Sequence, residues 1–237
     1  MATTSSSAPR VRSAMLASSL TVRQLLMADG PFAPGTQRVP WRKLLLVVLV
    51  VTAFHGAAIG SLGVRPRAML YGAIKLPILF SCATLLCLPN LYVVHACCGL
   101  RKDFDASVRG ILCAQGTAAV TLVALAPVVL FAYACDASYP AALLVNATAF
   151  ALAAWAAQVA LSRHLAPLIA RDGRHRRIVV AWFVLHAFVA TKVSWILRPF
   201  VGDPELPVAF LRAGQWWEDP FTNLFWAAAA LLAGLFR

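Results

Sequence analysis

The sequence predicts an all-α protein, a polytopic bundle of transmembrane helices with six spans, or five if the last short apolar run does not cross. Of its 237 residues, 61% are apolar and 13% are charged, whereas an ordinary soluble domain is about 45–50% apolar and about 25% charged. Uncharged runs of about 20 residues, the length that crosses a bilayer, recur along the chain. The composition therefore excludes a soluble enzyme, a disordered tail and a secreted disulfide scaffold.

Residues 1–43 form the first predicted unit, a cytoplasmic N-terminal tail without a run long enough to span. The first 28 residues of this tail carry three Arg and no acid, a composition also found in organelle transit peptides. Residues 14–27 fit a short amphipathic helix on the membrane surface, and a loosely ordered tail is the other interpretation. The second unit, residues 44–237, is the transmembrane helical domain.

The first two predicted spans follow this tail. The first covers residues 44–62, and the Trp-Arg-Lys sequence at 41–43 anchors it at the membrane interface. The second covers residues 69–100, which is too long for one straight crossing. It contains Pro77 and Pro89, each of which removes a backbone donor. We therefore expect one kinked, tilted helix.

The later spans are shorter. Residues 111–134, 141–161 and 178–197 form spans three, four and five. The last apolar run, residues 221–236, is about 24 Å long as a helix. That length is less than the roughly 30 Å of a typical hydrocarbon core, so this run is marginal as a sixth span.

The distribution of Lys and Arg predicts the orientation of the bundle. With the N-terminus inside, fifteen lie on the cytoplasmic side: Arg10, Arg12, Arg23, Arg38, Arg42, Lys43, Arg101, Lys102, Arg109, Arg163, Arg171, Arg174, Arg176, Arg177 and Arg237. Four lie on the far side: Arg65, Arg67, Arg198 and Arg212. This positive-inside pattern accounts for the net charge of +12 without nucleic-acid binding.

Three basic residues form the candidate site. Lys75 and Lys192 lie inside predicted spans, about 9 Å below the far surface, and Arg198 ends the fifth span. Charge within a span usually faces a cavity, a neighbouring helix or the interface. One interpretation is a basic vestibule that binds an anion or a lipid headgroup. The other is that the lysines snorkel to the headgroups or pair with acids of the loop at 202–220.

Small residues predict close helix packing. Gly56 and Gly60 form a GxxxG sequence, which lets two backbones approach each other. Packing inside the chain is the default interpretation, and dimerisation is the alternative. An alanine face in the fourth span, with Ala147, Ala151 and Ala154, fits the same tight packing.

Other polar residues within the spans indicate core hydrogen bonds rather than chemistry. His55, His95 and His186 lack the spacing of metal ligands, so we expect no metal and no cofactor. Asn146 opens an Asn-Ala-Thr triplet, but it lies too deep in span four for glycosylation and is better interpreted as an interhelical hydrogen-bonder. No Ser–His–Asp arrangement, pair of in-span acids or phosphate-binding loop is visible, which favours a protein without catalytic activity.

Three stretches resemble a family of uncharacterised bacterial polytopic membrane proteins: FHGAAIGS (54–61), AIKLPILFSCATLLCLPNLYVVHACCG (73–99) and WILRPFVGDPELPVAFLR (195–212). The layout is also loosely similar to Yip1-type membrane proteins. The resemblance implies no activity. It implies a shared framework of Lys75, Pro77, Pro89, Tyr92, Trp195, Arg198, Pro199, Phe200 and Gly202.

These observations favour a non-enzymatic membrane component that organises or assists other membrane proteins, in a bacterial inner membrane or, alternatively, an organelle membrane. Its expected partners are membrane lipids and other membrane proteins, not nucleic acid, and its oligomeric state stays open. A small transporter or channel with the basic vestibule is the alternative. A membrane-embedded lipid-modifying enzyme is a third interpretation.

Overall fold

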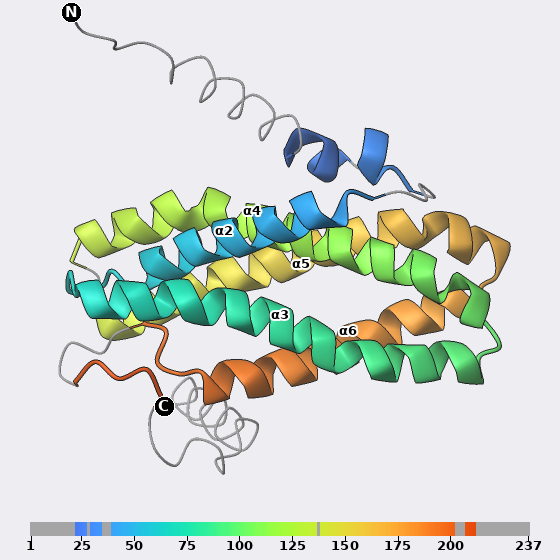
Figure 1. Ribbon diagram of the computed structural model, residues 1–237. Coiled ribbons are helices and arrows are strands. Elements are labelled where there is room, and N and C mark those ends of the chain that lie inside the picture. The colour runs from blue at the N-terminus through green and yellow to red at the C-terminus, as the bar shows by residue number, and fades with distance from the viewer. Residues whose placement is uncertain (1–21, 28, 35–38, 137, 202–206, 212–237) are drawn as a thin grey trace, which may run out of the picture.

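The computed structural model describes residues 22–27, 29–34, 39–136, 138–201 and 207–211 (Figure 1). Long α-helices make up most of this part of the chain, and no strand occurs in it. They are α2 (Trp41–Ile59), α3 (Pro66–Cys97), α4 (Phe104–Ala134), α5 (Tyr139–Arg171) and α6 (Arg174–Ile196). Two single-turn 3₁₀ helices, η1 (Gly30–Phe32) and η2 (Arg101–Asp103), precede α2 and α4.

All five long helices are long and apolar enough to cross a membrane. The all-α class and a helical bundle suited to a membrane are therefore confirmed. The predicted sixth run, residues 221–236, lies outside the described residues. The same holds for residues 14–21 of the predicted amphipathic helix.

Successive helices run antiparallel, so their connections gather at two ends of the bundle (Figure 1). We call one of them the basic end: it holds the α3–α4 and α5–α6 turns, with Arg101, Lys102, Arg171 and Arg174. The opposite end holds the α2–α3 and α4–α5 turns and the end of α6. Helix α2 packs on α3 and α4, α4 packs on α5, and α3 packs on α6.

Two helices extend well beyond the predicted spans at the basic end. Helix α4 begins at Phe104 rather than at residue 111, and α5 ends at Arg171 rather than at 161. The predicted spans end at charged residues, because charge marks the limit of an apolar run. The backbone hydrogen bonds of a helix do not require lipid, so the helices continue beyond that limit. Asp105 in the first turn of α4 and Arg171 in the last turn of α5 complement the helix dipoles, which stabilises these polar turns.

Helix α3 is one continuous helix from Pro66 to Cys97, as the sequence predicts. Pro66 occupies its first turn, where a missing N–H breaks no helical bond. Pro77 and Pro89 lie inside the helix. In a bundle such interior prolines are tolerated because neighbouring helices compensate for the lost bonds.

Helices α2 and α3 touch backbone to backbone at glycines. A Cβ built on Gly56 would overlap the carbonyl group of Gly72, and one on Gly60 would overlap the carbonyl group of Ala68. Only a residue without a side chain fits at such a contact. The structure therefore places the Gly56–Gly60 sequence at a packing site within the chain.

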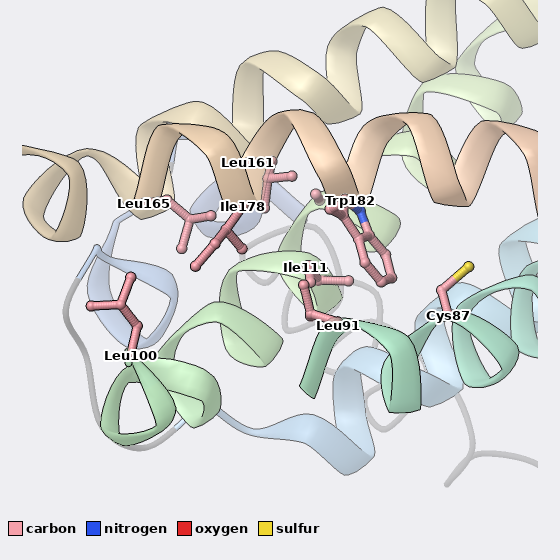
Figure 2. Close-up of a cluster of buried hydrophobic side chains, with 9 residues drawn as sticks. Cys87, Leu91, Leu100, Ile111, Leu161, Leu165, Ile178 and Trp182 are labelled. Carbon is pink, nitrogen blue, oxygen red and sulfur yellow. The ribbon is translucent and has the colours of Figure 1, made fainter. Parts of the chain in front are cut away.

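Two of the four apolar clusters among the described residues lie toward the two ends of the bundle. Figure 2 shows the cluster toward the basic end, where α3, α4, α5 and α6 meet: Cys87, Leu91, Leu100, Ile111, Leu161, Leu165, Ile178 and Trp182. The second cluster lies toward the opposite end: Ile59, Leu62, Leu76, Leu79, Ala142, Leu197 and Val201. Burial of these apolar side chains holds the helices together toward each end of the bundle.

The N-terminal residues that the structure describes pack on the bundle. Residues 22–27 are helical, and the side chain of Leu25 is 2% exposed, against Gly116 of α4. Phe32 is 1% exposed, and its carbonyl oxygen lies 2.9 Å from Nε2 of His164 in α5. This part of the predicted surface helix therefore contacts protein on its apolar side.

Candidate functional site

A cavity of about 880 Å³ is lined mainly by α4, α5 and α6, with Leu79, Phe80 and Ala83 of α3, and the segment after α6 lines one end of it. Small-molecule sites commonly have volumes of about 300–1,000 Å³. Along α5 its lining extends from Tyr139 to Leu161, a distance of about 33 Å along the helix axis. The cavity is therefore elongated along the bundle and about as long as a hydrocarbon core is thick.

The walls of this cavity are built from small side chains. Ala147, Ala151 and Ala154 of α5 line it, together with Ala187 and Ala190 of α6. The prediction that the alanine face of α5 serves tight packing is therefore wrong, because its side chains are too short to fill the space between α5 and α6. Ala151, Ala154 and Ala187 are also exposed, so the cavity is open along the side of the bundle.

Polar side chains are set into these apolar walls. Asn146 is buried and donates through Nδ2 to the hydroxyl of Tyr133 in α4, at 2.6 Å, and to the carbonyl of Ala142, at 2.7 Å. This is the interhelical hydrogen bond that the sequence predicts. Nε2 of Gln115 lies 3.0 Å from Nε2 of His186, which joins α4 to α6 across the cavity wall.

Arg198 lines the cavity at the opposite end of the bundle. Its guanidinium carbon lies 3.4 Å from the centre of the Trp195 ring, a cation–π contact. Its Nε donates to the carbonyl of Trp195 at 3.3 Å. The cavity therefore has a half-buried positive charge at one end and a largely apolar interior with a few polar side chains beyond it.

The two lysines of the candidate site do not line this cavity. Lys75 is 0% exposed, and its Nζ donates to the carbonyl of Pro199 at 2.8 Å. The same Nζ lies 6.0 Å from the ring centre of Phe200 and 5.2 Å from that of Phe210. Lys192 is half-buried on α6. Arg198 is thus the member of the predicted set that reaches the cavity.

Phe210 belongs to the segment 207–211, which the structure describes beyond α6. Its aromatic ring covers the ammonium group of Lys75. Residues 212–217 lie outside the described part of the chain, as do the acids at 203, 205, 218 and 219.

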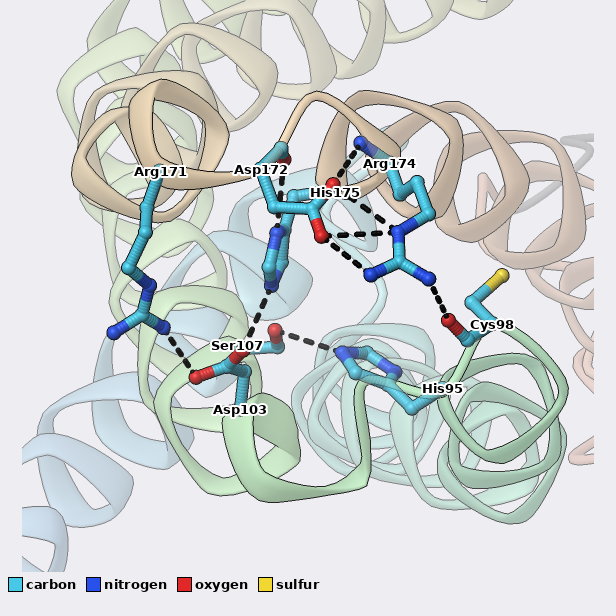
Figure 3. Close-up of polar contacts among 8 residues, drawn as sticks. All are labelled: His95, Cys98, Asp103, Ser107, Arg171, Asp172, Arg174 and His175. Atoms are coloured by element: carbon cyan, nitrogen blue, oxygen red, sulfur yellow. Dashed lines mark hydrogen bonds and ion pairs between the residues drawn. The ribbon is translucent and has the colours of Figure 1, made fainter.

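A polar network joins three helices at the basic end (Figure 3). Asp103, just before α4, accepts from Nη2 of Arg171 at 2.5 Å and lies 3.3 Å from Nε2 of His175. Nδ1 of His175 lies 3.1 Å from the carbonyl of Asp172. His175 therefore links the α5–α6 turn to Asp103.

Asp172 and Arg174 cap the α5–α6 turn of this network. The guanidinium of Arg174 donates to both carboxylate oxygens of Asp172 and, through Nη1, to the carbonyl of Cys98 at the end of α3. Hydrogen bonds from Arg174 lower the pKa of the Asp172 carboxyl to about 2. The turn is therefore fixed to α3 by a charge-assisted contact.

Ser107 and His95 form a pair that no sequence motif indicates. Oγ of Ser107 lies 2.9 Å from Nε2 of His95, and Nδ1 of His95 lies 2.9 Å from the carbonyl of Leu91. Because that carbonyl only accepts, Nδ1 of His95 is the donor. Nε2 therefore accepts from the hydroxyl of Ser107, as a general base accepts from a nucleophile. The prediction concerned a Ser–His–Asp arrangement, and a Ser–His pair alone neither confirms nor contradicts it. Both side chains are at most 1% exposed, so the pair joins α3 to α4 in the core.

In the part of the chain that the structure describes, no three His, Cys, Asp or Glu side chains gather as metal ligands. The histidines of the predicted spans are separated. His55 is buried edge to face with Phe150, at 6.1 Å between ring centres. His95 belongs to the basic-end network, and His186 lines the cavity.

Comparisons with protein-family models, with curated proteins and with solved structures found no match for this chain. The resemblance to a bacterial family of membrane proteins therefore stays a prediction. The function proposed for the cavity rests on its own geometry and chemistry.

Proposed function

We propose that this chain is a non-enzymatic integral membrane protein that binds an anionic amphiphile in the cavity, with the anionic head beside Arg198. The observation that carries the proposal is the cavity itself: about 880 Å³, elongated along the bundle, with alanine walls and a guanidinium at one end. An alkyl chain matches the apolar length, and a carboxylate or phosphate head matches the planar fork of an arginine.

The experiment measures binding of two anionic probes to the full chain. Stearate, assayed by equilibrium binding in mild detergent, represents a free fatty acid, and phosphatidic acid in nanodiscs represents a membrane phospholipid. Stearyl alcohol serves as the neutral probe. Binding of stearate alone assigns the cavity to free acids, and binding of phosphatidic acid alone assigns it to phospholipids.

Two variants locate the site. Ala154→Trp fills the cavity and is expected to weaken binding at least about tenfold, whereas Ala141→Trp, exposed on the same helix but outside the cavity lining, is the matched control. Arg198→Gln is expected to weaken binding of stearate about tenfold, because a hydrogen bond to a charged group is worth about 1.5–3 kcal/mol. Binding of stearyl alcohol should not change.

Failure of well-folded wild-type protein to bind either anionic probe would overturn the proposal. An equal effect of Ala154→Trp and Ala141→Trp would overturn it as well. A role in organising other membrane proteins would then be the better interpretation, and mild-detergent purification would test it through a stoichiometric partner.

The orientation is part of the same proposal. The excess of Lys and Arg at the basic end supports a cytoplasmic location for that end, by the positive-inside rule. Arg176→Cys, exposed in the first turn of α6, tests it in intact cells or spheroplasts. A membrane-impermeant thiol reagent should label this cysteine only after the membrane is opened.

A further inference from the structure

The interior of the cavity contains a hydrogen-bond acceptor that lacks a donor. Asn146 is 5% exposed and lines the cavity, and its Oδ1 has no hydrogen-bond partner among the described residues. A polar atom without a partner in an apolar setting is destabilising, and a helix bundle surrounded by lipid has little water to supply one. Oδ1 therefore indicates a ligand group that donates.

The orientation of this amide is fixed by its neighbours. Nδ2 of Asn146 lies 2.7 Å from the carbonyl oxygen of Ala142, which only accepts. If the amide were rotated so that Oδ1 took this place, two acceptors would face each other. The acceptor must therefore be the atom that is left without a partner, and the missing group must be an O–H or N–H donor.

A second polar atom in the same cavity also lacks a partner. Nδ1 of His186 is buried without a hydrogen bond to any described residue, while Nε2 of the same ring contacts the amide of Gln115. The ring is stacked on Trp182, with 5.1 Å between ring centres, so its orientation is held. The polar character of the interior is thus not confined to one side chain.

Oδ1 of Asn146 and Nδ1 of His186 lie deeper in the cavity than the position proposed for the anionic head of the ligand. Asn146 lies about 10 Å along α5 from Tyr139, and His186 lies about 15 Å along α6 from Ile196. Tyr139 and Ile196 both lie at the end of the bundle where Arg198 lines the cavity. A head beside Arg198 would leave Asn146 and His186 at the level of the alkyl chain.

We infer that the amphiphile carries a hydroxyl or amide N–H group part-way along its chain, which donates to Oδ1 of Asn146; this inference rests on the proposed function. The ligand class is an anionic amphiphile with a donating substituent on the chain, such as a hydroxy fatty acid. A plain saturated chain would leave both polar atoms without a partner.

The test compares stearate with hydroxystearates whose hydroxyl occupies successive positions along the chain, on the full-length protein. Wild-type protein should bind an isomer with a mid-chain hydroxyl about fivefold more tightly than stearate, the effect of one net hydrogen bond. A hydroxyl at the methyl end of the chain should give no gain. The preference for one position is the readout, and it needs no variant.

Asn146→Leu should remove the preference, so that this variant binds the hydroxystearates no more tightly than it binds stearate. The matched control is Thr148→Val on the same helix: Thr148 is exposed, its hydroxyl bonds the carbonyl of Leu144, and it is not part of the cavity lining. This control should keep the preference. If Asn146→Leu does not fold, the positional series on wild-type protein decides.

The outcomes separate failure of this inference from failure of the proposed function. If wild-type protein binds stearate and all hydroxystearates equally, the inference is overturned, because water or the chain itself then satisfies Asn146, while the proposed function stands. If wild-type protein binds none of these probes or phosphatidic acid, the proposed function fails and the inference fails with it.

Discussion

Nζ of Lys75 donates a 2.8 Å hydrogen bond to the carbonyl oxygen of Pro199, 124 residues away in the chain. The contact joins the first third of α3 to the segment after α6, and the rings of Phe200 and Phe210 lie near the same ammonium group. Lys75, which the sequence predicts as part of a basic vestibule, is therefore buried and connects α3 to the segment after α6.

Lys75→Ala is expected to lower the free energy of unfolding by about 2–3 kcal/mol, because the carbonyl of Pro199 loses its donor and the cation–π contacts disappear. Unfolding in a detergent–urea series, followed by tryptophan fluorescence, measures this change. The control is Lys43→Ala, exposed at the start of α2, which should change stability by less than about 0.5 kcal/mol. Equal losses in both variants would contradict the structural role.

Gly56→Ala is expected to destabilise the protein by about 3 kcal/mol, since the new methyl group would overlap the backbone of Gly72 and force α2 and α3 apart. Thermal unfolding in mild detergent measures the loss as a lower Tm. A Cβ on Gly173 meets no atom within 4 Å, so Gly173→Ala is the matched control and should leave Tm almost unchanged. An unchanged Tm for Gly56→Ala would show that the two backbones lie farther apart.

Asp172 gives a prediction about pH. Hydrogen bonds from Arg174 lower the pKa of this carboxyl to about 2 from 3.8, so the folded state favours the ionised form. The resulting stability is complete above about pH 4 and is lost as the pH falls toward 2. The Tm difference between wild type and Asp172→Asn should therefore be constant near neutral pH and shrink below about pH 4. Two Tm curves that stay parallel down to about pH 2 would refute the coupling.

Asp103 and Asp105, near the start of α4, allow a controlled test of the basic-end network. Asp103→Asn is expected to cost about 1–2 kcal/mol, because Asp103 contacts both Arg171 and His175 on other helices. Asp105 pairs with Arg109 within its own helix and its side chain is 79% exposed, so Asp105→Asn should cost less than about 0.5 kcal/mol. Chemical unfolding of both variants gives the comparison, and a larger loss at Asp105 would reverse our interpretation.

The helices themselves could be predicted because each depends on a local property. Long apolar runs mark α2 to α6, and the GxxxG sequence marks a close backbone contact. The cavity could not be predicted in this way. Ala147, Ala151 and Ala154 give the same sequence pattern whether a neighbouring helix packs against them or stands away, and only the separation of α5 and α6 decides.

The basic-end network escaped sequence analysis for a related reason. Asp103 and His175 lie in different turns, and each is an ordinary polar residue in its own segment. Ser107 and His95 lie 12 residues apart across the α3–α4 turn, and such a pair is recognised by its geometry rather than by its sequence spacing. These contacts exist only once the helices are placed side by side.

The docking of Phe32 has a consequence for biosynthesis. Its carbonyl oxygen is bonded to His164, a residue 132 positions later, and Leu25 beside it packs on Gly116. When the ribosome has released the first 32 residues, neither receiving surface has been made. Residues 25–32 can therefore complete their docking only after α5 has been synthesised.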